Sequence, residues 1–173
     1  MRDNSWLKKQ LDFLLGKYFA DVEIINPIDI RFGREAKYRF GSIRLISDKR
    51  IRGRRGIRSK ISNFQFPHFA KALRGEPISN FKSKIPAKSV ITITSMFAKE
   101  NVPVDVVCYT ICHELCHYAH GFSSTNKRLF KYPHHGGIVN KELQRRGAKH
   151  IILAFKKWLK SYRSQILAGR VSI

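Results

Sequence analysis

The stretch TICHELCHYAHGF, residues 110–122, most restricts how this chain can fold, because His113 and His117 stand four residues apart with Glu114 beside the first. Residues four apart in an α-helix lie on the same face, so both imidazoles can reach one metal ion if the stretch is helical. Glu114 lies about 100 degrees further round the axis, where its carboxylate can reach a water molecule without binding the metal. The pattern predicts a helical zinc site in which Glu114 is the catalytic base.

A hydrolytic zinc site needs a third protein ligand, and the sequence offers several candidates: His120, His134, His135 and Glu142. His120 follows His117 by three residues and lies a turn further along, which makes it a poor third corner. In the segment YPHHGG, proline and glycines allow the backbone to turn sharply before the next helix. His134 and His135 both fit a ligand approaching from outside the helix, and the spacing does not choose between them.

The helix that carries the motif is predicted to run from about Pro103 to His120 and to end at Gly121. Its apolar residues recur at three- and four-residue steps and should face a sheet; they are Val104, Val107, Ile111, Leu115 and Tyr118. Three cysteines, Cys108, Cys112 and Cys116, repeat every four residues on another stripe. They lack the C-x-x-C spacing of structural zinc sites, so we predict buried thiols.

The rest of the chain predicts an α+β fold, a small antiparallel or mixed sheet packed against the zinc-binding helix, with flanking N- and C-terminal helices. An amphipathic helix is expected over residues 1–20, and residues 28–32 and 38–47 look like paired strands. Another strand is expected within 89–97, and the length of 173 residues suits one domain, 1–173. We divide it into that first helix, a basic irregular insertion (48–88), a metal-site core (89–150) and a C-terminal helix (151–173).

The charge of the chain is strongly positive, with 34 Lys and Arg against 12 Asp and Glu, a formal net charge of +22. Such an excess predicts a polyanionic partner, with nucleic acid first. The segment KRIRGRRGIRSK (49–60) concentrates it, and we expect its basic side chains to contact phosphates: Lys49, Arg50, Arg52, Arg54, Arg55, Arg58 and Lys60. Phe64, Phe66 and Phe69 follow and could stack on bases, although aromatic residues in a small domain more often belong to the core.

The sequence has no apolar run long enough to span a membrane, and its start lacks the apolar core of a signal peptide. The three cysteines crowd into nine residues, which is no disulfide framework. We therefore expect an intracellular protein. The oligomeric state does not follow from the sequence.

The segments HELCH (113–117) and HGGIV (135–139) together resemble the SprT-like zinc metallopeptidases, the group that includes the Spartan proteases. In that family a His-Gly pair opens the helix that follows the motif. The resemblance implies that His113, His117 and His135 bind zinc and that Glu114 is the catalytic base. It also implies proteolysis, in some members of proteins trapped on DNA, which makes DNA a more natural partner than RNA. Val139 stands where the family often has an aromatic residue.

The expected function is that of a zinc-dependent metalloendopeptidase acting on protein substrates at or near DNA. The alternative is a basic nucleic-acid-binding protein in which zinc is structural and no protease activity exists. Tyr109, Tyr118 and Tyr132 are candidates for stabilising an oxyanion, although a core or surface role explains each more readily.

Overall fold

The computed structural model describes residues 1–46 and 87–169. The basic segment 49–60 and the three phenylalanines after it lie outside the described residues, so the predictions made for them stay predictions. The same holds for the prediction of one domain over the whole chain.

The N-terminal helix α1 (Asn4–Tyr18) forms where the periodicity predicts it. Asp3 caps it, because its carboxylate accepts a hydrogen bond from the Trp6 backbone N–H at 2.7 Å. Leu7, Leu11 and Leu14 are buried. Their spacing of three and four residues gives the helix one apolar face, which packs against strand β1 (Ile28–Phe32).

The sheet has three strands, β1, β2 (Gly41–Ile46) and β3 (Lys88–Ile93), in the order β1-β3-β2. β3 runs parallel to β1 and antiparallel to β2. The expected pairing of the first two strands is therefore wrong. β3, which lies between them, is the most buried of the three strands, and its residues Val90, Ile91 and Ile93 are buried as a central strand requires.

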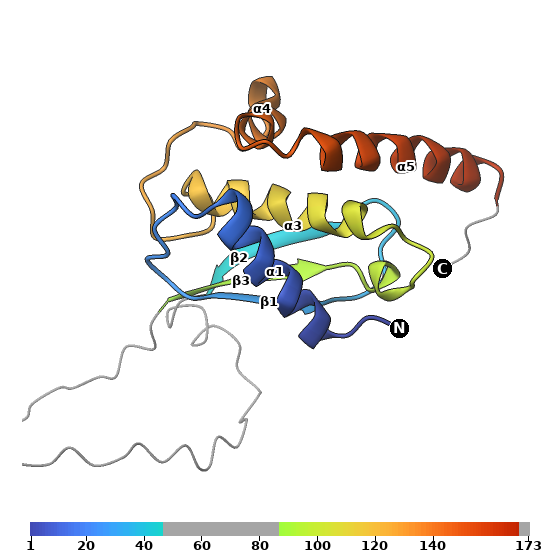
Figure 1. Ribbon diagram of the computed structural model, residues 1–173, viewed down its shortest axis with the longest axis horizontal. Coiled ribbons are helices and arrows are strands. Elements are labelled where there is room, and N and C mark those ends of the chain that lie inside the picture. The colour runs from blue at the N-terminus through green and yellow to red at the C-terminus, as the bar shows by residue number, and fades with distance from the viewer. Residues whose placement is uncertain (47–86, 170–173) are drawn as a thin grey trace, which may run out of the picture. The chain divides into compact units, whose positions relative to one another are not determined.

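One face of the sheet forms the core of the described part. Ile30, Ile91 and Ile43 are register partners across the three strands, and all three are buried in the same apolar cluster as α1 and α3 (Val104–Ala119). Figure 1 shows α1 and α3 against this small sheet, with α5 (Lys149–Leu167) running along α3. The mixed α+β class is confirmed.

Helix α3 agrees with the predicted bounds to within one residue at each end, and most of its side chains are buried. The predicted apolar stripe is too narrow, because α3 contacts the sheet, α1, α4 (Ile138–Arg145) and α5. Val104, placed on that stripe, is 44% exposed because it lies in the first turn. The three cysteines are buried free thiols, as predicted, and burial raises the pKa of each.

The helices α4 and α5 are separate. α4 ends at Arg145, and Gly147 adopts a positive φ of 78° between it and α5. The expected C-terminal helix begins at Lys149, two residues earlier than predicted, and ends at Leu167. None of the described helices is both long enough and apolar enough to cross a membrane.

Candidate metal centre

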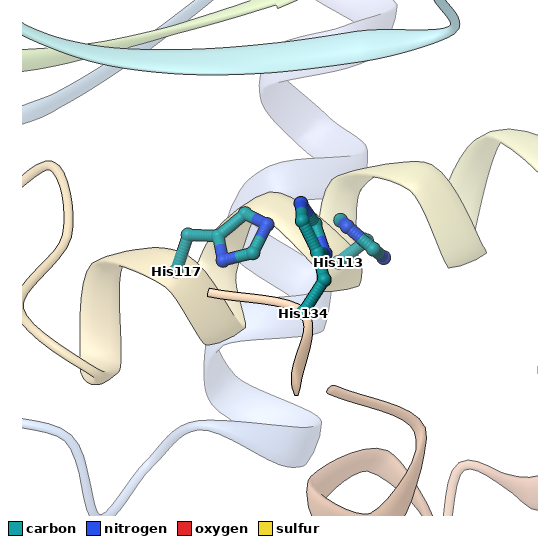
Figure 2. Close-up of side chains that lie close together, drawn as sticks. All are labelled: His113, His117 and His134. Atoms are coloured by element: carbon teal, nitrogen blue, oxygen red, sulfur yellow. The ribbon is translucent and has the colours of Figure 1, made fainter. Parts of the chain in front are cut away.

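Helix α3 presents His113 and His117 on the same side, as their four-residue spacing predicts, and their ring centroids lie 4.8 Å apart. A third imidazole comes from outside the helix. The ring of His134 lies 5.2 Å from that of His113 and 4.7 Å from that of His117. One ligand atom from each histidine lies within 4.8 Å of the others, which is close enough for the three to hold one metal ion. Figure 2 shows the three rings converging, two from the helix and one from the loop.

The third histidine is His134, whereas the resemblance implied His135. His134 precedes the short 3-10 turn η2 (His135–Gly137), in which both glycines have positive φ. His135 is exposed, and its nearest ring neighbour is Tyr132 at 6.4 Å. The backbone turns away immediately after His134, so only the first residue of the pair reaches the group, a difference that sequence spacing does not show.

The loop that carries His134 is fixed at its start. Gly121 follows α3 with a φ of +75°, and a Cβ there would meet the carbonyl oxygen of Lys127 at 2.5 Å. Glycine is therefore required for the loop to fold back on itself. The Leu129 backbone N–H donates to the His120 carbonyl at 3.1 Å, and the Ser123 hydroxyl donates to the Ile43 carbonyl of β2 at 3.1 Å. These contacts return the chain toward His113 and His117.

The histidines of the group are suited to bind a metal. Burial, together with the neighbouring imidazoles, lowers the pKa of His113 to about 3 and that of His117 to about 4. Both rings are therefore neutral at pH 7, which is the ligating form. The buried Nδ1 of His117 has no hydrogen-bond partner among the described residues. A buried imidazole nitrogen without a partner is costly, and a bound ion is one way in which such a ring is satisfied.

Glu114 is 6% exposed and lies on α3 beside the histidines, facing strand β2. Burial raises the pKa of its carboxyl to about 7, and the positive charge of Arg39 and the backbone N–H of Ile43 offset only part of this. Near neutral pH this carboxyl can both accept and release a proton, which is what a general base and acid must do.

His113, His117, His134 and Glu114 open into one cleft of about 480 Å³ between α3, β2 and the loop. A second cavity of about 220 Å³ adjoins it, shares Arg39, Gly41, His113 and Glu114 with it, and is otherwise mostly aromatic. The walls of this aromatic pocket are Tyr38, Phe40, Tyr109, Thr110 and Phe155. The site therefore combines a polar, metal-binding floor with an apolar recess.

His120, the histidine nearest to the motif, lies outside the group, as predicted. It is buried against Phe130, with ring centroids 4.8 Å apart, and burial lowers its pKa. Glu142, the other ligand candidate, is instead paired with Arg145 and Arg146 at 2.7 Å each.

The three tyrosines differ in position. Tyr118 donates to the Asn26 carbonyl at 3.0 Å and is buried, so its role is structural. Tyr132 is 56% exposed. Tyr109 lines the aromatic pocket, stacks on Phe155 at 4.1 Å, and donates to Asn140 at 3.0 Å. Of the three, only Tyr109 both lines the site and has its hydroxyl held by a hydrogen bond to another side chain.

Sequence reasoning missed Arg39, Gly41 and Arg128, which line the cleft. None of them lies within a recognisable motif. Arg39 and Gly41 lie at the start of β2, and no local pattern indicates that this strand passes over the helix that carries His113 and His117.

No protein-family model, curated protein or solved structure matches this chain. The resemblance to SprT-like peptidases therefore stays a prediction, and the function is argued from the site alone.

Proposed function

We propose that the protein is a zinc-dependent metallopeptidase in which His113, His117 and His134 hold the metal and Glu114 is the catalytic base. The observation that carries this proposal is the grouping of three histidines with a buried carboxyl in one open cleft. Three histidine ligands with access to solvent are typical of catalytic zinc, whereas structural zinc is enclosed by four ligands.

A zinc ion in this site would lower the pKa of a water molecule and polarise the carbonyl of the bond to be broken. Glu114 then accepts a proton from the attacking water and delivers it to the leaving amine. Its raised pKa suits the first step, since a carboxylate with an ordinary pKa is a weaker base toward water, and a pKa near 7 still allows the proton to be released to the amine.

A peptide is the substrate that the cleft favours. Within the described sheet, β2 is an edge strand, and its residues Gly41, Ser42 and Ile43 line the cleft beside Glu114. An extended peptide can pair with an exposed strand edge through its backbone, which places its amide bonds along the edge. The aromatic pocket would then receive an apolar side chain of the peptide.

The cleavage test uses an unfolded protein as a generic substrate, with zinc content measured in parallel. Glu114→Gln should keep zinc and lose cleavage by a factor of about 100 or more, because general acid–base catalysis is typically worth that much. Retained cleavage in the zinc-loaded variant would overturn Glu114 as the base. No cleavage by the zinc-loaded wild type would leave a structural zinc in a nucleic-acid-binding protein as the alternative.

The choice of third ligand has its own test. His134→Ala should lower the zinc content measured after dialysis and lower cleavage, whereas its neighbour His135→Ala should keep both. The opposite result would restore the ligand set implied by the resemblance.

We further propose that this activity operates at nucleic acid, DNA before RNA, as the formal net charge of +22 suggests. The predicted contacts from Lys49 to Lys60 support it on charge alone. Cleavage of a DNA-bound protein should exceed that of the same protein free in solution, and equal rates would count against the proposal.

A further inference from the structure

Helix α5 carries a row of cations on its outer side: Lys149, Lys156, Lys157, Lys160 and Arg163, here called the α5 basic face. At 100 degrees per residue these five positions fall within roughly 120 degrees of the helix circumference. All five residues are exposed. The face extends over about 21 Å, since its end residues are fourteen positions apart at 1.5 Å each.

The α5 basic face is not neutralised by the described part of the protein. The α5 sequence contains no Asp or Glu. Among the described residues, none of its five cations forms an ion pair, whereas the preceding Arg145 and Arg146 pair with Glu142 and Asp21. Like charges three and four residues apart repel one another along a helix, so this row is destabilising until an anion binds.

The opposite side of α5 is already occupied. Ile151 and Tyr162 are buried there, Ile152 is buried at the edge of the basic face, and the ring of Trp158 lies 5.6 Å from that of Phe97 and 5.5 Å from that of Phe40. An amphipathic helix binds a membrane by burying its apolar face among the lipids. Because α5 uses that face to pack on the core, the face that it leaves to solvent is mainly charged, with Leu153 and Leu167 as its exposed large apolar residues. Two leucines fourteen positions apart among five cations favour a phosphate backbone over a bilayer.

We infer that the α5 basic face is a nucleic-acid-binding surface that contacts backbone phosphates without reading the sequence. Duplex DNA presents one negative charge per about 1.7 Å of its axis, so a 21 Å row of cations meets several phosphates at once. Lysines, which make up four of the five, bind phosphate as point charges and add no base specificity. This surface rests on the proposal that the protein acts at nucleic acid, but it does not depend on the metal site.

The test compares two triple variants of the full-length protein by fluorescence anisotropy with a labelled duplex of mixed sequence. Lys156, Lys157 and Lys160 are changed to Gln in one, and Lys8, Lys9 and Lys17 of α1 in the other, which removes the same charge from another exposed helix. The α5 variant should bind roughly tenfold or more weakly at about 100 mM salt, and its log–log salt slope should fall by about 2 to 3. The α1 variant should change both values much less.

An equal loss in both variants would show that net charge alone attracts DNA, and no loss in the α5 variant would likewise overturn the inference. Vesicles containing phosphatidylserine provide the second arm, and a loss of vesicle binding with unchanged DNA binding would assign α5 to membranes. Circular dichroism of both variants checks that α5 still forms.

Two further measurements separate this inference from the proposed peptidase. The α5 variant should still cleave a short peptide at the wild-type rate, and Glu114→Gln should still bind DNA with wild-type affinity. The DNA-binding result can therefore be interpreted even if the peptidase proposal fails, and the cleavage result can be interpreted even if α5 does not bind DNA.

Discussion

Gly41, the first residue of β2, lies close to Glu114, the proposed catalytic base. A Cβ at this position would meet Thr110 Cγ2 at 2.7 Å and Glu114 Oε1 at 2.9 Å. Glycine is needed here because the space beside the carboxylate is narrow. Its backbone does not require glycine, because its φ is not in the positive region. The distance from strand to helix, and with it the burial of Glu114, depends on this missing side chain.

Gly41→Ala should therefore push Glu114 aside and reduce peptide cleavage while the three histidines still bind zinc. Overpacking of this kind also costs about 1–3 kcal/mol in the free energy of unfolding. Gly16→Ala on α1 is the matched control, since a Cβ there meets nothing within 4 Å, and it should stabilise by about 0.5–1 kcal/mol. Wild-type cleavage by Gly41→Ala would show that Glu114 tolerates the displacement.

Glu114 also predicts how the stability of the metal-free protein changes with pH. The folded pKa of about 7 lies above the ordinary value of 4.5, so the folded state binds the proton more tightly than the unfolded state. The contribution of neutral Glu114 is complete below pH 4.5 and is lost as the pH rises through 7. Glu114→Gln should then be equal to wild type, up to a constant offset, at acid pH and gain up to about 3 kcal/mol at pH 8.

Urea unfolding of both proteins in the presence of a chelator measures this difference. Protonation of His113 and His117 occurs in both and cancels on subtraction. A difference between the two proteins that is independent of pH would contradict the raised pKa.

At the scale of the elements, the sequence predicted the features that depend on the order of residues within one segment. The leucine spacing of α1 predicted that helix to within three residues at each end, and the valine and isoleucine periodicity of α3 predicted that helix to within one, because side-chain period and caps act within a few residues. The spacing of His113 and His117 gave two members of the metal group for the same reason.

What the sequence did not predict is set by contacts between distant segments. β1 and β2 have similar strand character, and nothing in either shows that β3 lies between them. The choice of His134 over His135 depends on where the loop enters η2, which is set by contacts of the loop with β2 and α3. Arg39 belongs to the site only because β2 crosses α3.

The loop from α3 to η2 supplies a prediction at this scale. Gly121→Ala must adopt a positive φ and also clash with the Lys127 carbonyl, so the loop that carries His134 should shift and zinc affinity should fall. Gly147→Ala has the same positive φ but open space around it, and should cost only about 1–2 kcal/mol of stability. Zinc titration with a competing chelator compares them, and equal affinities would show that the loop position does not depend on Gly121.

At the scale of the whole molecule, a metal held by α3 and the loop would tie two segments of the fold together. Removing the metal with a chelator should lower Tm, because a ligand at about 1,000 times its Kd stabilises by roughly 4 kcal/mol. His134→Ala should lower the starting Tm and lose most of the chelator effect. His120→Ala, which lies outside the group, should keep the decrease in Tm on adding chelator. A wild-type Tm that does not change when the chelator is added would count against a bound metal.

The register of the sheet has a consequence for how the chain can be edited. Ile46, the last residue of β2, is the partner of Lys88, the first residue of β3, in an antiparallel pair. The backbone thus leaves the sheet and re-enters it at adjacent points, so a two-residue Asn-Gly turn can close the same strand pair. A chain with that turn in place of residues 47–87 should keep zinc and peptide cleavage, while any difference in DNA affinity measures what the excised stretch contributes. Metal chemistry and the share of polyanion recognition that belongs to residues 47–87 would then be separable by one deletion in the gene.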